Sequence, residues 1–227
     1  MGPISTALKA ALVGAPVGAA GFAVWTRNSH FVPITAADPI FSSAAYTKYN
    51  PHRNPATQDI CVRRIPLRDI KPSLLEKEGK LVEAFCAGVW GGIGYWYQRR
   101  YLAKKYQNTI TTGHQLWERA DLQASTYDVG TQITDHFEVV EKQPDHITVR
   151  CGDSPLNSGL RDSDGLFEMG VEIKEAEGVA EFRLKSIFYK GLTKVEDGKP
   201  PMPEFVEWAH RQYCKFWMES AVRNVEA

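Results

Sequence analysis

The chain has 227 residues, of which 43% are hydrophobic and 24% charged, a composition that is typical of globular proteins and excludes wholesale disorder. Lys plus Arg and Asp plus Glu each number 27, so no net field recruits nucleic acid or an anionic membrane, and we expect no nucleic-acid partner. The length fits one large domain, or a smaller domain with an added N-terminal segment.

The sequence carries no signature of a cofactor or a metal site. It has no GxGxxG turn after a strand, no P-loop, and no GxSxG or HExxH motif. Neither the histidines nor the cysteines share a metal-ligand spacing, so we predict no metal and no cofactor. Isolated cysteines favour a reducing compartment, and two disulfides in a secreted protein are the alternative. The four cysteines are Cys61, Cys86, Cys151 and Cys214.

An apolar segment opens the chain. It runs from Ala10 to Trp25, about 16 residues, whereas a membrane span needs about 20. Three roles fit it: a helix or arm packed on the domain, a membrane or organelle anchor, and a signal peptide. A Pro-rich stretch without a sustained period follows at 30–57, and its apolar and aromatic residues indicate that it lies on the domain. We expect an N-terminal apolar helix and Pro-rich arm over 1–57, a ligand-binding domain over 58–227, and a cytoplasmic protein whose N-terminus offers weak membrane association as an alternative.

The first half of the domain predicts one strand and several helices. The strand covers Asp59–Pro66, and a capping box formed by Ser73 and Glu76 predicts that a helix begins at Ser73. The glycines of GVWGGIG at 88–94 predict a break in this helix or the close approach of another backbone. Further helices are predicted at 95–106 and 114–126.

The second half alternates with period two and then ends in an amphipathic helix. The alternation predicts four antiparallel strands joined by short turns: Thr131–Lys142, Asp145–Asp153, Gly165–Glu175 and Val179–Gly191. A final helix at Glu204–Asn224 carries an aromatic stripe. The fold class is therefore α+β, with an antiparallel sheet wrapped around a long C-terminal helix and an added N-terminal helix or arm. Such an arrangement leaves room for a small-molecule cavity between helix and sheet.

The segment 127–191, which begins YDVGTQITDHFEVVEKQPDHITVRCGD, and WAHRQYCKFWMESAVRN at 208–224 resemble the DUF2867 family of unknown function. Its final helix starts near an FHR-like triplet, which here is Ala209, His210 and Arg211 without the leading Phe. The resemblance covers about 59–224 and implies the helix-grip architecture of lipid and polyketide binders and cyclases. The chain also resembles small fungal proteins encoded beside natural-product pathways, some of which are cofactor-free cyclases or isomerases.

Charged residues beside the expected cavity are the catalytic candidates. The loop 153–164 gathers Asp153, Arg161 and Asp164 between two strands. A carboxylate at the edge of an apolar cavity gains a raised pKa and can act as a general acid or base, and an Arg can stabilise an oxyanion. A solvated, Asp-rich turn is the alternative.

Three further candidates depend on where the cavity lies. Glu168 and Lys185 alternate opposite to the apolar set, which predicts cross-strand ion pairs on a solvated face, or a reactive pair if the cavity is on that side. His114 is the histidine candidate, whereas His136 is expected to pair with Glu138 at the surface and His210 to be structural. The expected substrate-binding residues are Tyr95, Trp96, Trp117, Phe167, Met169, Phe188, Trp208 and Tyr213.

The resulting hypothesis is a cofactor-independent cyclase or isomerase of an aromatic or polyketide-like intermediate, acting by acid–base catalysis in an apolar cavity. Intramolecular addition of a hydroxyl to an alkene is an example of such a reaction. The alternative is a non-catalytic protein that binds a lipid or another hydrophobic metabolite. A structural accessory protein, attached to a membrane through 10–25, is the third candidate.

Overall fold

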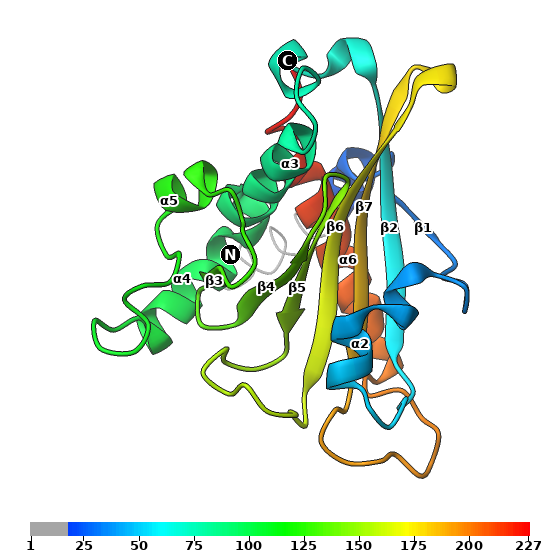
Figure 1. The fold of residues 1–227 in the computed structure, drawn as a ribbon. Coiled ribbons are helices and arrows are strands. Elements are labelled where there is room, and N and C mark those ends of the chain that lie inside the picture. Colours follow the sequence, from blue (N-terminus) through cyan, green and yellow to red (C-terminus); the bar gives the residue numbers. More distant parts are fainter. Residues whose placement is uncertain (1–17) are drawn as a thin grey trace, which may run out of the picture.

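A computed structural model describes residues 18–227. Its centre is a seven-stranded sheet with the order β1-β2-β7-β6-β5-β4-β3, in which all neighbours are antiparallel (Figure 1). The predicted α+β class is confirmed. The strands are β1 (His30–Val32), β2 (Thr57–Pro66), β3 (Gln132–Ile133), β4 (Phe137–Lys142), β5 (His146–Cys151), β6 (Asp164–Lys174) and β7 (Val179–Tyr189).

Helices cover both faces of the sheet. The long C-terminal helix α6 runs along one face, here called the inner face, and the short α2 lies against the opposite, outer face (Figure 1). Residues 18–25 also form a helix, whose Trp25 ring contacts Phe216 of α6 with the ring centroids 5.3 Å apart. The other α-helices of the described residues are α2 (Ala44–Tyr49), α3 (Lys80–Gly91), α4 (Ile93–Tyr106), α5 (Arg119–Ala124) and α6 (Glu204–Val222). Short 3-10 turns occur at Pro39–Ser42, Leu67–Asp69, Pro72–Leu74 and Glu175–Glu177.

The main core lies between the inner face and the helices α3 and α6. Alternate residues of β6 and β7, such as Met169 and Phe182, point toward these helices and are fully buried. Phe182 packs on Phe85 of α3, and Trp90 of α3 meets Trp217 of α6 with ring centroids 5.6 Å apart. The period-two pattern of the late strands therefore identifies the side of the sheet that the long helix covers.

The outer face carries a second, smaller core. Leu166 and Ile187 of the sheet are fully buried there beneath Ile40 and the ring of Tyr46. These covering residues come from the Pro-rich stretch, which also adds β1 to the edge of the sheet beside β2. The expectation of a solvated outer face is thus wrong for this region, because the arm lies on it.

Three element boundaries differ from the sequence prediction. The helix predicted from Ser73 begins at Lys80, because 72–74 form a 3-10 turn and Gly79 adopts φ 83°. The strand predicted over 131–142 is interrupted at Thr134 and Asp135, which both have positive φ. The helix predicted at 114–126 is shorter, spanning Arg119–Ala124.

The glycine-rich segment serves both predicted purposes. It separates α3, which ends at Gly91, from α4, which begins at Ile93. A Cβ atom built on Gly88 would lie 2.3 Å from the backbone oxygen of Ala221 in α6. Only glycine permits this approach of the two helices, since a backbone atom cannot move aside as a side chain does.

All four cysteines are free and buried, as expected of small hydrophobic residues. Within residues 18–227, none of the helices has the length and apolar character needed to cross a membrane. The first half of the apolar segment Ala10–Trp25, residues 10–17, lies outside the described residues.

Candidate functional site

A pocket lies between α6 and the inner face of the sheet, where the sequence predicts a cavity. Its volume is about 270 Å³, and we call it the helix–sheet pocket. Half-exposed residues such as Gln98 and Met202 contribute to its wall, so the pocket is accessible from solvent. The lining residues are Gln98, His136, Phe137, Cys151, Gly152, Ser163, Phe167, Ser186, Phe188, Met202, His210, Tyr213, Cys214 and Trp217.

The expected substrate-binding residues divide into three groups. Phe167, Phe188 and Tyr213 line the helix–sheet pocket. Tyr95, Trp117 and Met169 are buried in the adjoining core and do not reach the pocket, and Trp96 and Trp208 are exposed at the surface. Trp208 follows the predicted aromatic stripe of α6 but stacks on the exposed Phe205 instead of entering the pocket.

An ion pair between Asp59 and His210 lies at the polar side of the pocket. Asp59 occupies an inward-facing position of β2, in line with the buried Cys61, and is 3% exposed. Its Oδ2 lies 3.3 Å from Nε2 of His210, whose side chain is 17% exposed. Oδ1 of Asp59 has no hydrogen-bond partner among the described residues. A buried carboxylate without full hydrogen bonding depends on its counter-ion, so the pair holds His210 in the charged form.

The pKa of His210 reflects this pairing. Burial alone lowers the pKa of the imidazole, but the hydrogen bonds and charges of Asp59 and Cys214 outweigh burial and raise the pKa to about 10. The ring also stands edge-on to Phe188, with centroids 5.0 Å apart. The raised pKa favours the imidazolium form of His210, whose side chain lines the pocket.

His136 lines the same pocket and differs from His210 in that its pKa is lowered, which favours the neutral imidazole. Burial lowers the pKa of this imidazole, and the charges of Asp135 and Asp153 oppose the shift without cancelling it. The ring reaches the pocket from the turn between β3 and β4, in which Thr134 and Asp135 adopt positive φ. The predicted surface pair with Glu138 is absent from the ion pairs of the described residues. His136 is neutral and can accept a proton.

Three side chains at the polar side have the donor atoms for a metal. The ligand atoms of Asp59, His210 and Cys214 all lie within 4.8 Å of one another, and Nε2 of His210 is 3.6 Å from Sγ of Cys214. Tetrahedral zinc, with bonds of about 2.0–2.1 Å to N and O and about 2.3 Å to S, sets its ligand atoms about 3.3–3.6 Å apart. The donor types of the cluster fit a metal, and so do the distances from Nε2 of His210 to Asp59 and to Cys214. The ion pair between Asp59 and His210 is an alternative explanation of the same arrangement.

The loop residues predicted to be catalytic have structural partners. Asp164 forms a buried ion pair with Arg150. Arg161 donates to the backbone oxygens of Asp153, Ser154 and Asn157 and so closes the loop on itself. The loop touches the pocket only at its two ends, through Gly152 and Ser163.

The remaining loop and histidine candidates are also occupied elsewhere. The Asp153 carboxylate accepts from Ser154 and Asn157, and this keeps its pKa low despite partial burial. His114 lies at the surface and bonds to Gln132. None of these groups lines the helix–sheet pocket.

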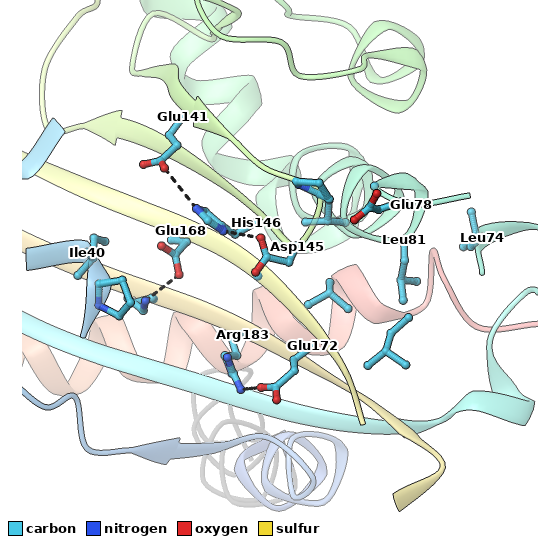
Figure 2. A pocket seen from close by; sticks show the side chains of 18 of the residues that line it. Ile40, Leu74, Glu78, Leu81, Glu141, Asp145, His146, Glu168, Glu172 and Arg183 are labelled. Atoms are coloured by element: carbon cyan, nitrogen blue, oxygen red, sulfur yellow. Dashed lines mark hydrogen bonds and ion pairs between the residues drawn. The ribbon is translucent and has the colours of Figure 1, made fainter. Parts of the chain in front are cut away.

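Glu168 and Lys185 line a different cavity of about 610 Å³, to which the arm, the outer face of the sheet and the start of α3 contribute (Figure 2). They are direct cross-strand neighbours, as predicted, and Nζ of Lys185 lies 2.7 Å from Glu168 and 2.8 Å from Asp38. Figure 2 also shows Arg183 paired with Glu172 and His146 between Glu141 and Asp145. Because Lys185 is bound by two carboxylates, we assign the pair to attachment of the arm rather than to catalysis.

Sequence reasoning missed the Asp59–His210–Cys214 cluster, although part of the signal was present. His210 and Cys214 are four residues apart on one helix, so they lie on the same face. Asp59 falls in the buried phase of a strand that also places Cys61 and Ile65 inward. A charge in that phase indicates a buried partner.

Comparisons with family models, with curated proteins and with solved structures found no match to this chain. The resemblance to DUF2867 stays a prediction, and the case for function depends on the geometry of the helix–sheet pocket.

Proposed function

We propose that the protein is a cofactor-independent isomerase or cyclase that acts on a small hydrophobic molecule in the helix–sheet pocket. One observation carries the proposal: His136 and His210 line the same aromatic pocket, and their pKa values are shifted in opposite directions. When the pKa values of two groups in one site are shifted apart, the group with the lowered pKa is suited to act as the base and the group with the raised pKa as the acid. The proposal agrees with the resemblance to natural-product cyclases.

The reaction moves protons and needs no oxidant. For addition of a hydroxyl to an alkene, the hydroxyl proton passes to the neutral His136 while the oxygen bonds to one alkene carbon. The other carbon takes its proton from His210, and the π electrons of the alkene form the new C–H bond. Asp59 stabilises the charged His210 before the transfer. The two histidines then exchange protons with water, and the product has the mass of the substrate.

The walls of the pocket favour a compact aromatic ligand. Phe137, Phe167, Phe188 and Trp217 supply apolar surface that can hold one conformer of a flexible substrate. The volume of about 270 Å³ lies at the lower end of ligand pockets, which span about 300–1,000 Å³. This size supports a small ring-containing metabolite rather than a long-chain lipid.

The test is incubation of the full chain with a library of hydrophobic aromatic and polyketide-like alkenols, followed by chromatography and mass spectrometry for products of unchanged mass. We expect His136→Gln and His210→Gln each to reduce the rate by about 100-fold or more, the usual contribution of a general acid or base. The matched control is His114→Gln, which removes an exposed histidine outside the pocket and should leave the rate unchanged.

Two results would overturn the proposal. Binding of library members without an equal-mass product would identify a carrier. Stoichiometric metal in the purified protein, lost in Asp59→Asn and Cys214→Ser, would assign the cluster to a metal centre and remove His210 from the acid role.

A further inference from the structure

Helix α4 and its flanks carry the most one-sided charge in the molecule. Residues 84–117 contain no Asp or Glu, whereas the chain as a whole has 27 acidic and 27 basic residues. The basic residues Arg99, Arg100, Lys104 and Lys105 all lie within α4. This local excess of four positive charges, in a protein without net charge, indicates that the surface of α4 attracts an anionic partner.

The same helix exposes large apolar and aromatic side chains. Ile93, Tyr97 and Tyr101 are 65%, 76% and 54% exposed, and Trp96 is 46% exposed. The helical periodicity places these four positions on one face, opposite the buried Tyr95 and Leu102. Arg100 and Lys104 belong to the exposed face by the same periodicity. Figure 1 shows α4 at the periphery of the fold, on the side away from the sheet.

The cations and the aromatic rings of this face are in contact. The guanidinium of Arg100 lies 5.1 Å from the centre of the Trp96 ring, and Nζ of Lys105 lies 5.7 Å from that of Tyr101. Ile110, 92% exposed, continues the apolar surface in the loop after the helix. Rings and aliphatic side chains framed by Lys and Arg are characteristic of helices that lie in the headgroup region of a bilayer.

We propose that the outer face of α4, formed by Ile93, Trp96, Tyr97, Arg100, Tyr101, Lys104 and Lys105, docks on the surface of an anionic membrane. The exposed aliphatic residues favour a bilayer over a nucleic acid, because they offer no stacking surface to bases. The inference does not depend on the proposed isomerase activity. It has a consequence for the pocket, because Gln98 of α4 lines it and accepts a hydrogen bond from Tyr213. Docking places the helix that carries Gln98 at the lipid in which hydrophobic molecules dissolve.

The test is co-sedimentation of the full chain with vesicles of phosphatidylcholine alone and with vesicles containing 30 mol% phosphatidylserine, over a series of salt concentrations. We expect binding to the anionic vesicles that weakens as salt rises. The variant Arg100→Gln/Lys104→Gln/Lys105→Gln should reduce the partition coefficient on the order of 100-fold, since each basic residue near an anionic surface contributes a factor of about five. Trp96→Ser/Tyr97→Ser should also weaken binding, with less change in its salt dependence.

The matched control is Lys77→Gln/Lys190→Gln/Lys199→Gln, which makes the same change in net charge at exposed positions outside α4. It should bind anionic vesicles within about threefold of the unsubstituted chain. Circular dichroism and thermal unfolding of each variant establish that the fold is retained.

Three outcomes overturn the proposal. Equal losses in the α4 variant and the control would show an effect of net charge alone. Binding to neutral vesicles that α4 substitutions leave unchanged would place the contact elsewhere in the chain. Binding of a single-stranded oligonucleotide that depends on Arg100, Lys104 and Lys105, with no binding to vesicles, would assign the face to nucleic acid.

Discussion

The guanidinium of Arg150 and the carboxylate of Asp164 form a two-point ion pair with almost no contact with solvent. Nε of Arg150 donates to Oδ1 at 2.9 Å and a terminal nitrogen donates to Oδ2 at 2.6 Å. The two side chains are 1% and 0% exposed. Arg150 also donates to the backbone oxygen of Gly159 and stacks on Tyr49, so the pair joins β5, β6, the loop and the arm.

Loss of this pair should destabilise the whole fold. Asp164→Asn leaves the Arg150 charge buried without a counter-ion, and we expect the free energy of unfolding to fall by about 3–5 kcal/mol. Urea denaturation followed by tryptophan fluorescence measures the change. The control Asp162→Asn alters an exposed carboxylate of the same loop and should stay within about 0.5 kcal/mol. A small loss at Asp164 would mean that water reaches the pair.

Gly88→Ala should separate α3 from α6. The added methyl group would lie 2.3 Å from the backbone oxygen of Ala221, and relief of this overlap requires helix displacement that we expect to cost about 1–3 kcal/mol. Thermal unfolding is a suitable measurement. Gly21→Ala is the matched control, because a Cβ there meets no atom within 4 Å and alanine is the better helix former. Equal stability of the two variants would contradict the close packing of the helices.

Stability should decline on the alkaline side because of His210. Its pKa is about 10 in the folded protein against 6.5 in the unfolded chain, so the folded state binds the proton more tightly. The stabilisation is complete below pH 6.5 and is lost as the pH rises through about 10. Chemical denaturation at pH 6–10 should show this slope, and His210→Gln should flatten it. An unchanged slope in the variant would assign the pH dependence to other groups.

On the acid side, Glu181 should govern part of the transition. Burial opposes its charge, but hydrogen bonds from Arg183, Lys174 and Arg64 outweigh burial and lower its pKa to about 2 from the ordinary 4.5. Its contribution is present above pH 4.5 and is lost as the pH falls through about 2. Glu181→Gln should therefore destabilise the protein at pH 7 and reduce the dependence of unfolding on pH between 4.5 and 2. Glu196→Gln, at an exposed site, is the control.

The C-terminal half of the fold could be predicted because each of its long strands and helices shows a regular spacing of apolar residues. The strands β6 and β7 alternate over eleven residues each, and α6 has a clear apolar stripe. The apolar and aromatic residues of the arm indicate that it lies on the domain, but its place on the outer face could not be predicted because the contributing segments are short. β1 has three residues and α2 has six, too few to show a period. Their positions depend on tertiary contacts with Leu166 and Ile187, which the local sequence does not reveal.

The candidate site was predicted in place but not in its chemistry. The space between α6 and the sheet follows from the two apolar surfaces, and Phe167, Phe188 and Tyr213 line it. His136 is brought to the site by a turn with positive φ at Thr134, and Asp59 lies 151 positions before His210, so neither relationship is local. The sequence pattern instead suggested the charged loop 153–164, whose Arg and Asp residues stabilise the conformation of the loop itself.

The arm over the outer face has a consequence for attempts to shorten the chain. A fragment starting at residue 58 would lack β1 and leave β2 as a bare edge, open to pairing with strands of other molecules. It would also expose Leu166 and Ile187 to water and deprive Lys185 of Asp38. Such a fragment should self-associate, so the Pro-rich stretch is an integral layer of the fold rather than a dispensable leader.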